Sequence, residues 1–319
     1  MNRRRPRAAH AHAARTRARR LTPVVSIGAW LAILCLPGAG TALAHEPLWG
    51  ETPTIFGPGV IHPEFRFGYL RRGGTTDPGD ERMEEFEQMV AVQYGINRYV
   101  NVRATLPGMR TTLEQNIDGV TPSTVVAGGG DLVLDAKWRY HLHQETGIQR
   151  SQALILGWKL PTGDDDRTGP DGARLDPSQQ PGSGRHGIEL GWAIDQERLV
   201  DSWWACAFYE HDFGGGFARG DTGEVTAAYG RWLVRPNSAE EFGMNLAAGI
   251  HAEAAGSDSL EDGSSAGNAW RIAGVHVTPI FTKGRAQYRI GVFVPLARSG
   301  DEEMTDYPWE VRAGWEMFF

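Results

Sequence analysis

The sequence has almost no cysteine, no long apolar run and no excess of basic residues. Of its two cysteines, only Cys206 lies beyond residue 44, so neither an internal disulfide nor a metal site of paired cysteines is expected there. No stretch after residue 44 approaches the roughly 20 apolar residues that a transmembrane helix needs. The fold must therefore be held by packing and hydrogen bonds, and a bundle of membrane helices is not expected.

Residues 1–44 have the three parts of a secretory signal. Eight arginines and no acidic residue fall in the first 20 positions, an apolar stretch covers about 24–36, and small residues end at Ala44. Such a leader is removed on export. An N-terminal anchor is the alternative, but the apolar stretch is too short to span a bilayer. We predict a signal peptide at 1–44 and one mature domain at 45–319.

Removal of that leader leaves a strongly acidic chain. Without its eight arginines, 24 basic residues remain against 39 acidic ones, a net charge of about −15. Because a basic patch is the usual footprint of nucleic-acid binding, we expect no nucleic-acid partner. No residue pattern indicates a cofactor.

Alternation of apolar and polar residues fills most of the mature chain. The clearest run is 132–143, where Leu, Ala, Trp and Tyr alternate with charged residues and histidines, and 307–319 repeats the pattern up to the terminal Phe319. Successive side chains of a β-strand point to opposite faces. We count twelve such segments, of which 202–211, 224–235 and 269–280 are the vaguest, the last with a possible bulge. An all-β fold is predicted.

The connections between these segments alternate in length. Short turns are expected near 144–149, 197–200, 236–240 and 283–285, and long polar links include 107–129 and 163–187. Outer-membrane barrels place long loops outside and tight turns in the periplasm. A periplasmic β-sandwich, the alternative, gives no reason for this alternation. We predict an antiparallel up-and-down transmembrane β-barrel of about twelve strands in the outer membrane of a Gram-negative bacterium, without a plug.

Three motifs carry a resemblance to a known family: G-D-L-V-L-D-A-K-W-R-Y (130–140), G-W-K-L-P-T-G-D (157–164) and P-G-S-G-R-H-G-I-E-L-G-W (181–192). They resemble the outer-membrane barrels of the phenol-degradation-pathway (MetA) family, clearly over about 130–195 and elsewhere by pattern only. That family is associated with uptake or export of small, often aromatic or hydrophobic compounds. The resemblance implies a transport role. The terminal Phe resembles the C-terminal signature that the outer-membrane insertion machinery reads.

The polar faces of the predicted strands supply candidate pore-lining residues of both charges. In a twelve-stranded lumen they fit a narrow aqueous channel, and they fit equally a lumen closed by ion pairs across strands. Loop 163–187 is the best candidate for a constriction because of its length. The pore-lining candidates are Glu64, Arg66, Glu87, Gln93, Arg103, Asp135, Lys137, Arg139, Lys159, Glu189, Asp195, Asn245 and Glu253.

An enzyme on this barrel would need a nucleophilic serine beside a histidine. Ser151, Ser183 and His186 are available, but no spacing places a serine and a histidine on one outward face. We therefore predict no catalytic residue.

Metal binding has three candidate ligands. His45 would become the amino terminus after signal cleavage, where amine and imidazole together chelate Cu(II). His141 and His143 would point to one side of a strand, facing the lumen if the alternation holds. Ordinary polar roles are the favoured explanation for these residues.

The pattern as a whole predicts a barrel embedded in the lipid bilayer that passes a small solute through a charged lumen. A non-conducting binding, sensor or structural barrel is the alternative, and an outer-membrane lipid hydrolase is the third.

Overall fold

The computed structural model describes residues 47–73, 81–115, 123–169, 172, 174–213, 217–238, 240–300 and 307–319. All of these belong to one compact unit, 38–319. The expected signal peptide and His45 lie outside the described residues. None of the described residues forms a helix long and apolar enough to cross a membrane.

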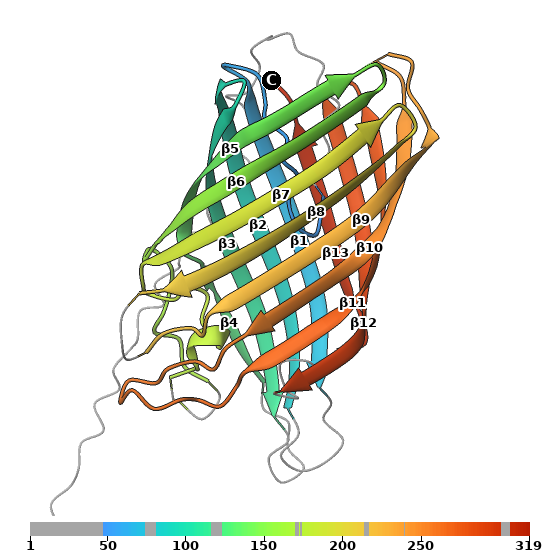
Figure 1. Cartoon of the computed structure of the whole chain (residues 1–319). Coiled ribbons are helices and arrows are strands. Elements are labelled where there is room, and N and C mark those ends of the chain that lie inside the picture. The colour runs from blue at the N-terminus through green and yellow to red at the C-terminus, as the bar shows by residue number, and fades with distance from the viewer. Residues whose placement is uncertain are drawn as a thin grey trace, which may run out of the picture. The chain divides into compact units, whose positions relative to one another are not determined.

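Thirteen strands form one antiparallel sheet that closes through the pairing of β2 with β3 (Figure 1). β4 and β5 follow one another along β3, so the closed wall is twelve strands wide, as predicted. The strands are β1 (Ile61–Gly73), β2 (Glu81–Asn97), β3 (Val100–Gln115), β4 (Ser123–Gly129), β5 (Leu132–Glu145), β6 (Ile148–Leu160), β7 (Gly187–Arg198), β8 (Asp201–Asp212), β9 (Thr222–Val234), β10 (Gly243–Ala255), β11 (Trp270–Lys283), β12 (Ala286–Gly300) and β13 (Glu310–Met317).

The three vague segments are the regular strands β8, β9 and β11, and β11 has the expected irregularity, between Ala273 and Gly274. The expectation of a long loop over 107–129 is wrong. Most of this stretch is strand, because β3 continues to Gln115 and β4 pairs antiparallel beside it. Proline has no backbone N–H to donate to a ladder. At Pro107 the partner of β3 accordingly changes from β5 to β4.

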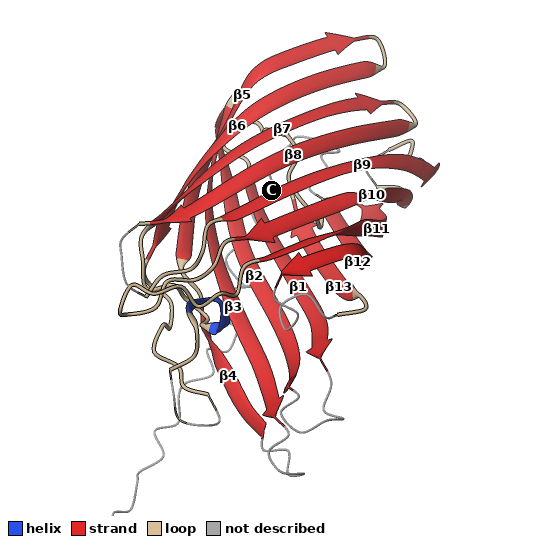
Figure 2. Ribbon diagram, turned by 60° about the horizontal axis from the view of Figure 1, so that its bottom comes forward, coloured by secondary structure: helices blue, strands red, loops and turns tan. Residues whose placement is uncertain are grey.

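Tight turns and long connections lie at opposite ends of the barrel. Figure 2 shows the long loops gathered at one end, with the short 3-10 helix η2 (Pro177–Gln179) among them. The first strand begins and the last strand ends at the end with the tight turns. There Ile61 and Phe319 exchange backbone hydrogen bonds of 3.3 and 3.1 Å. The alternation of connection lengths is that of outer-membrane barrels.

The outer surface of the barrel is apolar. On β6, Leu154, Leu156 and Trp158 are 45–56% exposed, whereas Ala153 and Ile155, which alternate with them, are at most 2% exposed. Aromatic side chains on this surface also bond to one another at their polar atoms: the Trp192 indole donates to the Tyr140 hydroxyl over 3.1 Å. An apolar belt with aromatic side chains is a lipid-facing surface.

We predict that Leu156→Arg destabilises the barrel in phospholipid vesicles by about 2–4 kcal/mol, because a charge would face the hydrocarbon. Reversible urea unfolding measures the change. Leu199→Arg is the matched control, since Leu199 is equally exposed but lies in the turn between β7 and β8. It should cost no more than about 1 kcal/mol. Equal costs at the two positions would contradict the assignment of the β6 face to lipid.

Candidate functional site

Residues 47–56, here called the N-terminal segment, lie inside the barrel before the chain enters β1. Leu48, Trp49 and Phe56 are at most 1% exposed. The segment touches walls far apart in the sheet: Gly50 packs against Cys206 of β8, and Leu48 packs against Gly314 of β13. The expected barrel without a plug is therefore wrong. The segment carries no strand alternation, so its sequence gave no sign of an internal position.

Trp49 fixes one side of the segment to the wall. Its ring stacks on His276 at a centroid distance of 5.0 Å and lies 6.4 Å from Phe293. Gly291 provides the room, because a Cβ atom there would lie 2.4 Å from the indole. Arg312 approaches the same ring to 5.4 Å from its centroid, a distance suited to a cation–π contact.

Glu51 fixes the other side through ion pairs. Lys137, 2% exposed, donates to Glu51 Oε2 over 2.8 Å, and Arg103 pairs with Glu51 and also with Asp135, the latter at 2.7 Å. Burial alone would raise the pKa of Glu51, but Arg103, Lys137 and Arg66 outweigh it and hold that pKa well below its usual value. The segment thus supplies a carboxylate that pairs with two cations of the wall.

A second group of ion pairs closes the lumen near the tight turns. The Arg289 guanidinium, fully buried, lies 2.6 Å from Glu64 and 3.2 Å from Glu316. His62 lies 3.4 Å from Glu316, and its ring is covered by Phe56 and Phe318 at 4.4 and 4.8 Å. This end of the lumen is densely packed around the N-terminal segment.

The connection between β6 and β7, expected as a constriction, folds against the other end of the wall. Its Leu175 forms an apolar cluster with Leu113 of β3 and Val126 of β4. Asp131 anchors it further, accepting hydrogen bonds from the Ser183 amide at 2.6 Å and hydroxyl at 2.7 Å. The Ser183 hydroxyl, considered above as a nucleophile, is therefore held in a structural contact.

Neighbouring loops fasten this connection in place. Asp258 accepts hydrogen bonds from the Ser178 amide at 2.8 Å and the Gly220 amide at 2.9 Å. Arg219 donates to the Pro177 carbonyl at 3.0 Å. Three long loops thus form one bonded cap at the mouth of the barrel.

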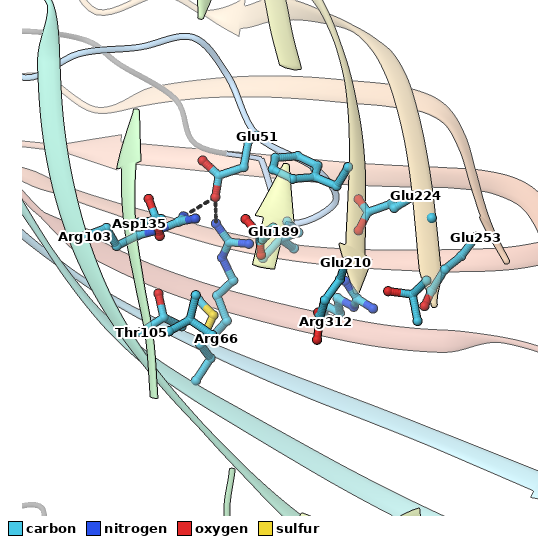
Figure 3. Close-up of a pocket in the computed structure, with 17 residues that line it drawn as sticks. Glu51, Arg66, Arg103, Thr105, Asp135, Glu189, Glu210, Glu224, Glu253 and Arg312 are labelled. Atoms are coloured by element: carbon cyan, nitrogen blue, oxygen red, sulfur yellow. Dashed lines mark hydrogen bonds and ion pairs between the residues drawn. The ribbon is translucent and has the colours of Figure 1, made fainter. Parts of the chain in front are cut away.

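A cavity of about 300 Å³ lies in the lumen beside the N-terminal segment (Figure 3). Its volume is at the lower end of the range for small-molecule sites. The apolar groups in its wall include Leu48, Met89 and Phe208. Its charged groups are Glu51, Arg66, Arg103, Asp135, Glu189, Glu210, Glu224, Glu253 and Arg312. The cavity therefore combines charge with apolar surface, the composition of a binding site for a small amphipathic molecule.

The candidates predicted from the sequence divide between this cavity and the wall around it. Five of them line the cavity: Arg66, Arg103, Asp135, Glu189 and Glu253. Gln93 and Asn101 share a buried hydrogen bond, Asn245 is buried beside Gly230, and Glu87 lies against Gly68. The remaining five are held in ion pairs or hydrogen bonds: Glu64 and Lys137 as above, Lys159 with Glu210 and Asp212, Asp195 with the Ser151 amide, and Arg139 with the Arg98 carbonyl of the turn between β2 and β3.

Four charged residues of the cavity escaped the sequence analysis. Glu210 and Glu224 lie on β8 and β9, whose alternation is weak, and Glu51 lies outside any strand. Arg312 is one of the polar residues that alternate with apolar ones in 307–319. The alternation of polar and apolar residues in β8, β9 and β13 is the one signal that points to Glu210, Glu224 and Arg312, and it does so only when the register of these strands is known.

The expectation that His141 and His143 face the lumen is wrong. A register shift between Arg139 and His141 moves the alternation by one residue, so that His141 pairs with Gln152 and His143 with Arg150. Gln152 is on the outward face of the barrel, where it accepts a hydrogen bond from the Tyr140 hydroxyl. His141, paired with Gln152, therefore faces outward too. The described residues contain no group of three or more side chains suited to hold a metal ion.

A closed twelve-stranded sheet with an apolar outer belt and a charged interior defines a β-barrel of the bacterial outer membrane. Among solved structures, the chain is similar to an outer membrane channel from Pseudomonas putida F1, with a TM-score of 0.62, 14% identity, and coverage of 83% of this chain and 97% of that one. At this identity the likeness establishes the fold.

Two further structures are similar at TM-scores too low to support an inference. The β domain of the Bordetella autotransporter BrkA scores 0.39 at 14% identity, covering 81% of this chain and 98% of that one. The CymD monoaromatic hydrocarbon channel scores 0.37 at 7% identity, covering 83% and 89%. No protein-family model and no curated protein sequence matches the chain. The resemblance to the phenol-degradation family therefore stays a prediction.

We predict that Glu51→Gln loosens the N-terminal segment, since Lys137 and Arg103 would remain buried without its charge. Removal of one partner from a buried ion pair costs roughly 3–5 kcal/mol. Hydrogen exchange of the backbone amides of 47–56, followed by mass spectrometry, should accelerate in the variant at pH 7. Glu145→Gln, at an exposed ion pair with His143, is the control and should leave that exchange unchanged.

The pH dependence of the same exchange has a defined sign. Because the folded-state pKa of Glu51 is lowered, its stabilisation is fully present above the ordinary glutamate pKa and is lost as the pH falls through the lowered value. After correction for the intrinsic chemical rate, protection of 47–56 should decline on acidification in the wild-type protein and less in Glu51→Gln. An equal decline in both proteins would contradict this role of Glu51.

Proposed function

We propose that this barrel passes a small solute across the outer membrane and that the N-terminal segment sets the narrowest part of its route. The observation that carries the proposal is the cavity of about 300 Å³ inside the lumen, lined by charged side chains from both sides of the barrel. A barrel with a purely structural role has no need of a charged internal cavity, because charges are costly to remove from water.

The position of the N-terminal segment supports a restricted route. Leu48, Gly50 and Glu51 contribute directly to the cavity wall, so a solute in the cavity touches the segment. Toward the tight turns, the buried pairs of Arg289 close the remaining lumen. Passage then requires a displacement of the segment, and its contacts determine how often the route is open.

The similarity to a solved outer membrane channel is consistent with this proposal. The resemblance of 130–195 to the phenol-degradation family adds small aromatic or hydrophobic compounds as the expected solute class.

A non-conducting barrel is the second candidate, and one observation favours it. The N-terminal segment is held on two sides, by Trp49 against β11 and β12 and by Glu51 against β3 and β5. A segment fastened in this way would leave a binding or sensor protein whose lumen never opens. The two candidates differ in whether current flows.

Single-channel recording in planar lipid bilayers separates these functions. We predict discrete current steps for the wild-type protein and larger or longer steps for the Leu48→Ala/Trp49→Ala double variant, since both changes remove contacts that hold the segment. Trp138→Ala is the matched control, because Trp138 is 53% exposed on the outer face; its steps should equal those of the wild type. If correctly folded wild-type and double-variant barrels both stay silent after insertion, the non-conducting barrel is the better description.

A further inference from the structure

Seven of the nine charged side chains of the cavity, all except Glu51 and Asp135, are divided between two opposite walls. Three arginines stand on one side: Arg66 on β1, Arg103 on β3 and Arg312 on β13. Four glutamates stand on the other, on β7, β8, β9 and β10: Glu189, Glu210, Glu224 and Glu253. In the order of the closed sheet, β7–β10 lie diametrically across from β13, β1, β2 and β3. A molecule in the cavity therefore lies between an arginine wall and a glutamate wall.

The arginine wall is already compensated. Arg66 pairs with Glu64 at 2.6 Å, Arg103 pairs with Asp135 and Glu51, and Arg312 pairs with Glu310. Each guanidinium thus has a carboxylate within the protein. An anionic ligand would have to compete with these intramolecular partners.

The glutamate wall is compensated only in part. Glu210 pairs with Lys159. Glu224 and Glu253 each lie 3.8 Å from one shared histidine, His251. Glu189 forms no ion pair among the described residues; the Arg103 guanidinium, which already pairs with Asp135 and Glu51, acts on it only through space, as Arg312 does on Glu224 and Glu253. The carboxylates of this wall are therefore less completely paired than the guanidinium groups of the arginine wall.

An aromatic ring lies within the glutamate wall. Phe208 of β8 is paired with Gly191 on one side and with Glu224 on the other. The ring covers Gly191 so closely that a Cβ atom there would lie 2.3 Å from it, and it forms part of the cavity lining. An aromatic ring among carboxylates is a favourable surface for an organic cation, which gains both ion pairing and a cation–π contact.

We propose that the solute held in this cavity is a small organic cation, an ammonium compound whose charge faces Glu189 and Glu224 and whose apolar part contacts Phe208. The assignment rests on the proposed function for its setting and adds the charge of the solute to it. Two observations support this assignment. The glutamates of the cavity are less completely ion-paired than its arginines, which favours a cation, and the Phe208 ring favours an organic cation over an inorganic one.

Three probes of nearly equal size test the assignment: benzylammonium, benzyl alcohol and benzoate. Isothermal titration calorimetry with the refolded protein in detergent micelles measures their binding. We expect benzylammonium to bind at least about tenfold more tightly than the other two, the effect of one charge-assisted interaction. Equal affinities, or preference for benzoate or benzyl alcohol, would overturn the assignment.

Variants locate the binding. Glu189→Gln/Glu224→Gln should weaken benzylammonium by about tenfold or more and leave benzyl alcohol unchanged. Phe208→Leu should weaken benzylammonium more than potassium ions, which have no apolar part. Glu240→Gln, at an exposed turn between β9 and β10, is the control for carboxylate removal. Undiminished benzylammonium binding by the well-folded double variant would exclude the glutamate wall.

Conduction is measured separately, so the two proposals fail separately. Cation binding in a barrel that carries no current would keep the cavity assignment and reject passage. Current without selective cation binding would keep passage and reject the assignment. Heat-modifiable migration on gels shows that each variant is folded before either measurement.

Discussion

The structure depends on one constraint: in the hydrocarbon of a bilayer, backbone N–H and C=O groups find no water and must bond to each other. A sheet meets this requirement only by closing, which here happens where Ile61 meets Phe319 and where β2 meets β3. Closure fixes the parity of each strand. Every second side chain then faces lipid, and the polar residues of all strands are collected in one interior.

Collecting charges in one interior creates a second requirement, because a buried charge needs a partner. The wall satisfies many of its charges from neighbouring strands, as Arg289 shows with Glu64 and Glu316. Lys137 of the wall also pairs with Glu51 of the N-terminal segment, with 2.8 Å between Lys137 Nζ and Glu51 Oε2. The N-terminal segment therefore does more than occupy the lumen, because its Glu51 neutralises charged side chains of the barrel wall.

The sequence predicts the fold well because the alternation of lipid-facing apolar residues with inward polar residues is a local signal. It is repeated in each strand and is clear at 132–143 and 307–319. It predicts the site less well for a physical reason. Which charges meet depends on register and on contacts across the lumen, and neither leaves a local pattern. A one-residue bulge after Arg139 reverses the parity of His141, and nothing local reveals that Glu51 reaches Lys137, 86 positions away.

The contacts of the N-terminal segment also bear on how the barrel assembles. Leu48 packs against β13, Trp49 against β12 and Gly50 against β8, so this short stretch contacts strands that lie far from it in the sequence. Such long-range contacts form late and at high entropic cost. Their full free energy becomes available only when the final strands arrive. Residues 47–56 can therefore be fully held in the lumen only once β12 and β13 complete the wall around them.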